Sequence, residues 1–580
     1  MLIKKGIAGS IGIAIGKALV LKEDNITPEH RTVEKNKIKS EIKRFKTALE
    51  LTNSDLNILY GKVLNILGKK HAKLIEAHRL ILKDPLITKE IPELISSQCL
   101  SAEAALQEIT ERTDEQFSKI DDGYFSERKH DIFDVAKKIN AHLLNTQKES
   151  LKNLKEHVIL VARNLYPSDT LYIKESNKVL GFCTDLGSKS SHTAIFAQSM
   201  GLPAVLGMKD ISSQIKSGDT VIVDGVRGLV IICPTKEITA RYQERKKELV
   251  NQEKYLEQLI GLPSVTGDGH TVNVFVNTDP GEPAVNFEKI KAEGIGLYRT
   301  EQLYMNRTEP PEEQEQTEIY RAAAEAVSPG PIIIRTADLG GDKITSFGIK
   351  SGKDEKNPFM GLRGIRLSLK YPDLLITQIR AIYKANAGGN IKMLIPMVSS
   401  FNEMISVRKI DAAVQRELAE EGFQAKPARI GIMVETPAAA LELDMLLPMI
   451  DFVSIGSNDL LQYTLAVDRV NQYVSELYEP FHPALLRLIY MIIQTAHKKG
   501  KPVSLCGEMA SDPYAIALLT GMGIDTLSVP AKLYLRTKNT VRSVNFERAA
   551  SLAMRALDLP TAREIRALIK ETLNEMQVTF

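Results

Sequence analysis

Residues 429–461 read RIGIMVETPAAALELDMLLPMIDFVSIGSNDLL, and this stretch decides the fold. It contains two short apolar runs, RIGIMV (429–434) and FVSIG (452–456), with a helical pattern between them. Short apolar runs that alternate with helical segments are typical of parallel strands joined by helices. Each run is followed at once by polar residues, Glu435 after the first and Ser457-Asn458-Asp459 after the second. The stretch therefore predicts a strand–helix–strand unit with reactive groups at its strand ends.

The same alternation continues outward through the second half of the chain. Its apolar runs are VNVFV (272–276), GIGLY (294–298), PIIIR (331–335), KMLIP (392–396), RIGIMV (429–434), FVSIG (452–456), PVSLC (502–506) and DTLSV (525–529). Eight such runs, with helical patterns between most of them, predict a (β/α)8 barrel. We assign the barrel to residues 262–580.

The first half of the chain has a different pattern. Apolar runs reappear as VILVA (158–162), KVLGF (178–182), TVIVD (220–224) and LVIIC (229–233), and the glycine-rich start looks like a further strand. We predict a small α/β domain made of residues 1–21 and 146–233. The intervening residues 22–145 are rich in Lys and Glu, and the apolar spacing of Ile38, Ile42, Phe45 and Leu49 predicts an inserted bundle of amphipathic helices. Residues 234–261 are highly charged and predict a linker helix.

Composition excludes several classes of protein. Lys plus Arg number 75 against 72 Asp plus Glu, the net charge is +3, and 43% of the 580 residues are hydrophobic. These values disfavour a disordered chain and a polycationic nucleic-acid binder. No apolar stretch reaches the ~18 residues of a membrane span, and the glycines of residues 6–16 favour a strand over a signal peptide. The four cysteines lie far apart and lack metal-ligand spacing, which is typical of a protein of the reducing cytoplasm. We therefore expect a cytoplasmic protein, and the short apolar stretches predict no membrane insertion.

The carboxyl ends of the barrel runs carry charged residues, and a barrel gathers its active site there. The arginines at or near these ends offer planar forks for phosphate or carboxylate groups: Arg299, Arg335, Arg363, Arg366 and Arg469. Glu435 and Asp459 supply the oxygen ligands that Mg²⁺ prefers. This combination predicts a small, doubly anionic phosphorylated acid as substrate.

Two further residues are candidates for chemistry. Cys506 ends an apolar run and is either a proton donor or a packing residue, because free cysteines are among the most buried residue types. His192, in the segment GSKSSHTA (187–194), is expected in the first turn of a helix. A helix N-terminus stabilises negative charge, so His192 is a candidate to carry a phosphoryl group, although a surface histidine would look the same.

Taken together, these segments resemble enzyme I of the phosphotransferase system, the phosphoenolpyruvate-protein phosphotransferase family. The resemblance covers nearly the whole chain. Its motifs are GIAIGKA at the start, the EAH segment around His78, PSDT (167–170), SHTA around His192, GIGLYRTE, RTADLGGDK, NPFMGLR, VETPAAA, DFVSIGSNDLLQYTLAVDR and LCGEMA.

The resemblance implies a role for each matching residue. His192 would be the phosphorylated nucleophile, with Thr170 as its hydrogen-bond partner, and Cys506 would protonate the enolate. Phosphoenolpyruvate would be held by Arg299, Arg335, Arg363, Asn458 and Arg469, with Glu435 and Asp459 as the Mg²⁺ ligands. The helical insertion would bind HPr, the small phosphocarrier protein, and the barrel would form a homodimer. The α/β domain would then be a phosphohistidine domain, and the chain would perform the first step of sugar phosphotransfer.

The match departs from the family pattern near the histidine. The family pattern is Gly-Gly-x-Thr-Ser-His, and here Ser188 stands in place of the second glycine and Ser190 in place of the threonine. Gln198 and Phe133 stand where arginines are frequent. These departures affect the expected transfer rate and fit to HPr. Two alternatives also remain: a regulatory, nitrogen-type enzyme I, and an enzyme like pyruvate phosphate dikinase without its nucleotide domain. The sequence does not name the final phosphoryl acceptor.

Overall fold

The structure is a computed structural model of the 580-residue chain. It describes all residues except 22–31, 68, 118–122, 145–153, 155, 166–168, 170–172, 174–175, 188–191, 282–284, 306, 341–356, 425, 470, 472, 577 and 579–580. The chain forms two compact units, Met1–Gln252 and Glu253–Phe580.

The second unit is built on a closed barrel of parallel strands, ordered β9 to β16 around the ring. The strands are β9 (Asn273–Thr278), β10 (Ile295–Arg299), β11 (Ile332–Arg335), β12 (Ile391–Ile395), β13 (Arg429–Val434), β14 (Phe452–Gly456), β15 (Val503–Cys506) and β16 (Thr526–Pro530). Each of the eight predicted runs forms one of these strands. The prediction of a (β/α)8 barrel is therefore confirmed.

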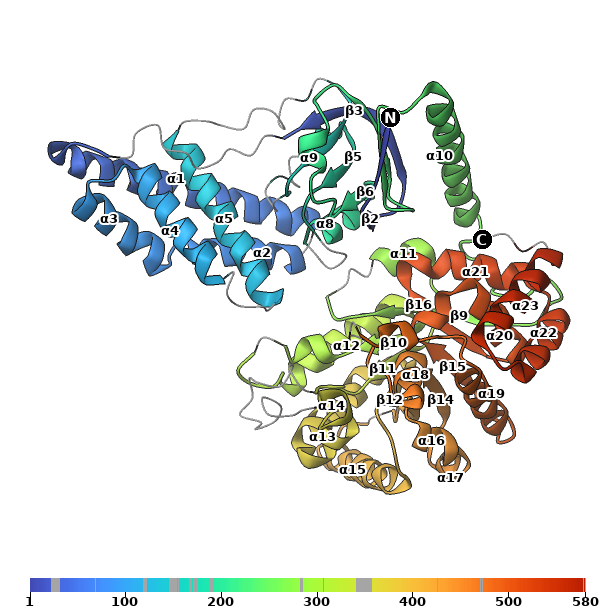
Figure 1. Cartoon of the computed structure of the whole chain (residues 1–580). Coiled ribbons are helices and arrows are strands. Elements are labelled where there is room, and N and C mark those ends of the chain that lie inside the picture. The colour runs from blue at the N-terminus through green and yellow to red at the C-terminus, as the bar shows by residue number, and fades with distance from the viewer. Residues whose placement is uncertain are drawn as a thin grey trace. The chain divides into compact units, whose positions relative to one another are not determined.

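Helices surround this barrel (Figure 1). They are α11 (Val285–Ile290), α12 (Glu313–Val327), α13 (Ile365–Lys370), α14 (Pro372–Ala385), α15 (Phe401–Glu420), α16 (Pro437–Leu441), α17 (Leu443–Leu446), α18 (Ser457–Leu465), α19 (Pro483–His497), α20 (Pro513–Met522), α21 (Tyr534–Ser543), α22 (Phe546–Asp558) and α23 (Ala562–Glu575). Their apolar faces and the outward strand residues share one core, while residues such as Leu297, Met433 and Cys506 form a separate cluster inside the barrel. This division follows from the alternation of side chains along a strand.

The first unit contains an eight-stranded mixed sheet in the order β1-β8-β7-β3-β4-β5-β6-β2. The strands are β1 (Leu2–Lys5), β2 (Ile7–Ser10), β3 (Ile13–Val20), β4 (Val158–Ala162), β5 (Val179–Thr184), β6 (Ala204–Leu206), β7 (Thr220–Asp224) and β8 (Leu229–Ile232). Strands β3 and β4 are parallel neighbours, with Lys17 opposite Val158. The residues between them are therefore an insertion into one sheet, as predicted.

The insertion is helical. Its helices are α1 (Ile38–Leu67), α2 (Lys69–Ile81), α3 (Ile91–Gln98), α4 (Ala102–Phe117) and α5 (Gly123–Leu143), with a π-helical turn at Leu86–Glu90. Phe45 is fully buried in their common core, and Ile38, Ile42 and Leu49 pack against it. Pro92 occupies the first turn of α3, where a proline is tolerated because its missing N–H would have no helical partner.

Three more helices complete the description of this half: α8 (His192–Met200), α9 (Ile211–Gln214) and α10 (Lys236–Glu257). Helix α10 lies within the predicted linker, and its Arg245 pairs with the buried Asp224 of β7 at 2.9 Å. Among the described residues, no helix combines the length and the apolar composition that crossing a bilayer requires.

Candidate active site

Two arginines, Arg335 at the end of β11 and Arg363 in the segment after it, are largely enclosed among carboxylates. Arg335 donates from Nη2 to Glu301 Oε1 at 2.7 Å and lies 3.3 Å from Asp338 Oδ2. Arg363 binds both oxygens of Asp338, at 3.1 and 2.7 Å, and also reaches Asp459 Oδ2 at 3.3 Å. Burial opposes the charged form of Arg335, yet the carboxylates of Glu301, Asp338 and Glu435 outweigh it and raise the pKa of its guanidinium. Both arginines are therefore permanent cations.

Glu435 follows β13 directly and is buried, with Oε1 accepting a 2.6 Å hydrogen bond from the backbone N–H of Met397. Burial raises its pKa well above the ordinary value, and the nearby charges of Asp459 and Asp338 add to this effect, although Arg335 and Arg363 oppose it. The glutamate is thus held in surroundings that disfavour its own negative charge.

These residues fit a divalent cation on two observations. Asp459 Oδ1 is buried and has no hydrogen-bond partner among the described residues, although a buried carboxylate oxygen ordinarily has one. A cation between Glu435 and Asp459 would also relieve the repulsion that raises the pKa of Glu435. The part of the chain that the structure describes contains no set of three or more His, Cys, Asp or Glu side chains suited to a metal. Two carboxylates suffice for Mg²⁺ when substrate phosphate and water supply the other ligands.

Arg299, at the end of β10, has a different setting. Its Nε and Nη2 donate to the two oxygens of Asp279 at 2.7 and 3.2 Å. Its side chain is 47% exposed, against 13% for Arg335 and 11% for Arg363. Arg299 therefore presents a guanidinium to solvent at the same end of the barrel where the other two are enclosed.

Asn458 and Arg469 extend the site along the segment after β14. Asn458 Oδ1 accepts a 3.2 Å hydrogen bond from the backbone N–H of Glu508, and its carbonyl accepts one from the Tyr478 hydroxyl at 3.1 Å. Burial raises the pKa of Tyr478, which Arg469 opposes through its charge and a hydrogen bond. Arg469 is exposed. It is linked to Asn458 through Tyr478, which bonds to both residues.

Cys506 ends β15 and lies in the cluster inside the barrel. Its Sγ is within 3.8 Å of the Ser454 hydroxyl and 3.5 Å of the Ile455 carbonyl oxygen. Burial raises the pKa of the thiol to about 11, while Ser454 and Arg335 act in the opposite direction. Near neutral pH the thiol therefore keeps its proton, as a proton donor must. Both original alternatives, donor and packing residue, are compatible with this position.

The candidate nucleophile lies in the first unit. Helix α8 begins at His192, so the predicted place of His192 in a first turn is confirmed. The His192 side chain, Thr170, Ser188 and Ser190 lie outside the described residues. Gln198, on the same helix, donates from its amide to the Gly9 carbonyl of β2 at 2.8 Å. Phe133 is half-buried in α5.

The structure also assigns contacts that the sequence-based prediction missed. Asp279 directly follows β9, and the Tyr463 hydroxyl oxygen accepts a hydrogen bond from Arg363 Nη1 at 3.1 Å. The position of Asp279 after the first apolar run was a usable signal, because polar residues at barrel strand ends mark the active face. Arg366 was grouped with the anion-binding arginines, but it bonds to the Met360 and Gly361 carbonyls and so supports a loop.

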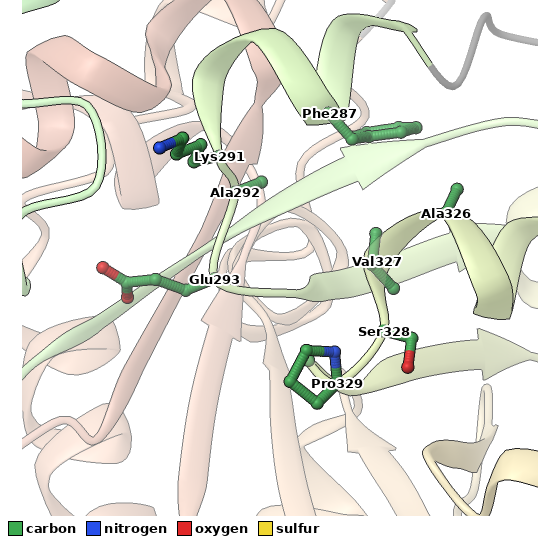
Figure 2. A pocket seen from close by; sticks show the side chains of 9 residues that line it. Phe287, Lys291, Ala292, Glu293, Ala326, Val327, Ser328 and Pro329 are labelled. Carbon is green, nitrogen blue, oxygen red and sulfur yellow. The ribbon is translucent and has the colours of Figure 1, made fainter.

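A cavity of about 610 Å³ lies at the other end of the barrel (Figure 2). Residues 287 and 291–293, before β10, and 326–330, before β11, line it. Because these residues precede the strands, the cavity is at the amino ends and contains none of the candidate residues. The candidate site is therefore located by strand direction and chemistry, and this cavity is not part of it.

Comparisons with known proteins agree with this arrangement. Family models match residues 5–128 ("PEP-utilising enzyme, N-terminal"), 154–228 ("PEP-utilising enzyme, mobile domain") and 253–546 ("PEP-utilising enzyme, PEP-binding domain").

Relatives match over almost their whole length. A phosphoenolpyruvate-protein phosphotransferase of Listeria monocytogenes is 39% identical over 568 residues, which is 98% of each chain. Those of Priestia megaterium and Haemophilus influenzae are 38% and 39% identical over 571 residues, covering 98% of this chain and 99% of theirs. The chain belongs to the phosphoenolpyruvate-protein phosphotransferase family of PEP-utilising enzymes.

Proposed function

We propose that this protein transfers the phosphoryl group of phosphoenolpyruvate to its own His192 and then to HPr, releasing pyruvate. The similarity to phosphoenolpyruvate-protein phosphotransferases along 98% of both chains carries the proposal. The barrel site supports it chemically, because largely enclosed permanent cations and a pair of carboxylates suited to a hard cation converge at one strand edge. This is the environment that a small phosphorylated carboxylic acid requires.

The arginines bind and orient the substrate. Arg299, Arg335, Arg363 and Arg469 contact its phosphate and carboxylate groups, and Asn458 adds a side-chain amide. Arg335 and Arg363 are already held by Glu301 and Asp338, so little reorganisation is needed when the substrate binds. Arg335 Nε is buried without a hydrogen-bond partner in the described structure and is one donor available to an anion.

Charge balance favours a cation with the substrate. The site contains the carboxylates of Asp279, Glu301, Asp338, Glu435 and Asp459, and a phosphorylated carboxylic acid adds further negative charge. Glu435 and Asp459 would hold Mg²⁺, which supplies charge neutralisation for the phosphoryl group and the enolate oxygen. Without it, the arginines are too few to balance the carboxylates and the substrate together.

The chemical step is an in-line exchange of bonds. An imidazole nitrogen of His192 attacks phosphorus, the N–P bond forms, and the P–O bond to the enolate breaks. The enolate carbon then takes the proton of Cys506, which gives pyruvate, and the thiolate regains a proton from solvent. The protonated state of Cys506 near neutral pH supports this role.

The partners and cofactor follow the same proposal. HPr binds the helical insertion, residues 22–145, and the barrel, residues 262–580, forms a homodimer. The protein acts in the cytoplasm as the first component of the sugar phosphotransferase system. A nitrogen-type regulatory enzyme would use the same barrel chemistry and differ in its acceptor, so the acceptor must be tested directly.

The test uses the full-length protein with ³²P-labelled phosphoenolpyruvate and Mg²⁺. We expect one acid-labile, base-stable phosphoryl group, mapped to His192, and its transfer to purified HPr of Bacillus subtilis. The His192→Ala variant should take no label. Undiminished labelling of that variant would refute the nucleophile assignment, and a labelled enzyme that does not phosphorylate HPr would favour a regulatory relay.

A further inference from the structure

We infer that Asp279 is a positioning residue for phosphoenolpyruvate binding, because it fixes the guanidinium of Arg299 toward the substrate. The inference rests on the proposed function and extends it to a residue outside the set already proposed to contact substrate or metal.

The barrel register places the two residues side by side. Strands β9 and β10 are parallel neighbours, with Thr278 opposite Tyr298. The next residues, Asp279 just past β9 and Arg299 at the end of β10, therefore lie beside each other at this edge of the sheet. Both lie at the carboxyl ends of their strands, the end at which barrel active sites form. Their contact is therefore set by the strands and not by a chance meeting of loops.

The pair has the geometry of a two-point clamp. Asp279 Oδ1 and Oδ2 accept from Arg299 Nε and Nη2 at 2.7 and 3.2 Å. Gln302 adds a third hydrogen bond, from Nε2 to Asp279 Oδ2 at 3.0 Å. The aspartate is only 15% exposed, so the carboxylate is the fixed partner and the arginine is the more exposed one.

The clamp uses only one edge of the guanidinium. Arg299 has five N–H donors in a planar fork, and Asp279 engages those on the Nε side. Arg299 Nη1 has no hydrogen-bond partner among the described residues. A phosphate or carboxylate can therefore bind the remaining edge while Asp279 stays in place.

The exposure of Arg299 explains why such a clamp matters. Arg335 and Arg363 are enclosed by several partners each, whereas Arg299 is 47% exposed and would otherwise sample many rotamers. Ordering an arginine side chain costs conformational entropy, which binding must offset unless the free protein has already ordered it. An ordinary exposed ion pair contributes little to stability, so the expected effect is on binding and not on folding.

The test compares Asp279→Ala, Asp279→Asn and wild type in pyruvate release with phosphoenolpyruvate, Mg²⁺ and HPr. We expect Asp279→Ala to raise KM about 5- to 10-fold with kcat changed less than about 2-fold. Asp279→Asn keeps one acceptor and should recover part of the loss. In the Arg299→Ala background, removing Asp279 should have no further effect on KM.

The controls separate this inference from its rivals. Glu575→Ala removes a pair with Arg548, whose 45% exposure matches that of Arg299, and should leave KM unchanged. A lower KM in Asp279→Ala would overturn the inference, because Asp279 would then compete with the substrate for Arg299. An unchanged KM in both Asp279 variants, in a folded and active enzyme, would also overturn it. Failure of the wild type to release pyruvate would refute the proposed function instead.

Discussion

The two ends of the barrel each bury a cation with carboxylates, but they satisfy it differently. At the amino ends of the strands, Lys538 is fully buried, pairs with Glu293 at 2.9 Å and donates to the Leu262 carbonyl at 2.6 Å. Glu293 also accepts from the Ser264 hydroxyl at 2.6 Å and from the Val274 N–H at 3.1 Å. Every charge in this group has a specific partner within the protein.

The carboxyl ends contrast with this. There Arg335 Nε and Asp459 Oδ1 are buried without hydrogen-bond partners in the described structure, and the pKa of Glu435 is raised by burial and by neighbouring carboxylates. The imbalance is unfavourable for the protein alone, and the proposed cation and substrate would remove it. One end of the barrel is therefore built for stability, and the other has free bonding capacity for a ligand.

The largest expected effect is the loss of activity in Glu435→Gln. This change removes one carboxylate from the proposed cation site with little change of shape. We expect turnover to fall about 10³-fold, because a bound metal would contribute several kcal/mol of charge stabilisation. Pyruvate release at several Mg²⁺ concentrations measures it. Asp451→Asn is the matched control, since Asp451 accepts from the Ile430 N–H at the amino end of the same strand. Equal activities of the two variants would contradict the contrast between the ends.

The converse change is Lys538→Met at the amino end. It leaves Glu293 without its buried cation, and removing one partner of a buried pair costs about 3–5 kcal/mol. We expect a loss of stability near the lower end of this range, because Glu293 is 25% exposed and water can solvate part of its charge. Calorimetry should show a lower Tm for the barrel transition, while KM for phosphoenolpyruvate stays unchanged below that temperature. A stable variant with altered KM would mean that the two ends are not independent.

The smaller catalytic effect is expected for Cys506→Ala. A positioned general acid contributes about 10²-fold or more, so kcat for pyruvate formation should fall by about that factor. Binding should change little, because the thiol contacts Ser454 and the Ile455 carbonyl and is not among the charged groups. Stopped-flow measurement of phosphoryl transfer and pyruvate release separates the steps. Weakened binding with an unchanged chemical step would identify Cys506 as a packing residue.

Much of the fold could be predicted from the sequence, because its signals are local. All eight barrel runs coincide with strands, and the α/β runs coincide with β4, β5, β7 and β8. Strand β6 was missed, since Ala204–Leu206 is too short to show a period. The glycine-rich start was predicted as one strand but forms three. Gly6 separates β1 from β2, and Gly12, at a φ of +131°, belongs to the turn between β2 and β3.

The site was predictable only in part. Strand ends identified the edge where charged residues gather, and the structure places Arg335, Arg363, Glu435 and Asp459 together there. Which group pairs with which was not predictable, because Arg363 meets Asp338 and Asp459 across 25 and 96 residues of chain. Arg366 shows the limit: three residues after Arg363, it supports a loop instead. The roles proposed for these residues remain predictions.

The smallest expected effect is a dependence of folding stability on pH. It tests whether Glu435 is unfavourably placed in the metal-free protein, and it needs no activity measurement. The pKa of Glu435 is higher in the folded than in the unfolded protein. At low pH the glutamate is protonated in both states and therefore does not change the free energy of unfolding. As pH rises through the unfolded value of 4.5, the unfolded chain releases this proton while the folded one retains it. The wild type should then lose stability relative to Glu435→Gln by up to about 1.4 kcal/mol per pH unit, until the folded pKa is passed.

This difference should reverse when Mg²⁺ is added. A cation that binds only the folded protein stabilises it by mass action, and Glu435→Gln has lost one of the two carboxylates that would hold it. In EDTA we therefore expect the barrel Tm of the wild type to fall increasingly below that of Glu435→Gln as pH rises above 4.5, and in saturating Mg²⁺ near neutral pH to exceed it. Calorimetry of both proteins at matched pH measures this. Tm curves that run parallel with pH in EDTA would show that the pKa of Glu435 is not raised in the metal-free protein. A Tm of Glu435→Gln that stays above that of the wild type in Mg²⁺ would show that the cation binds elsewhere.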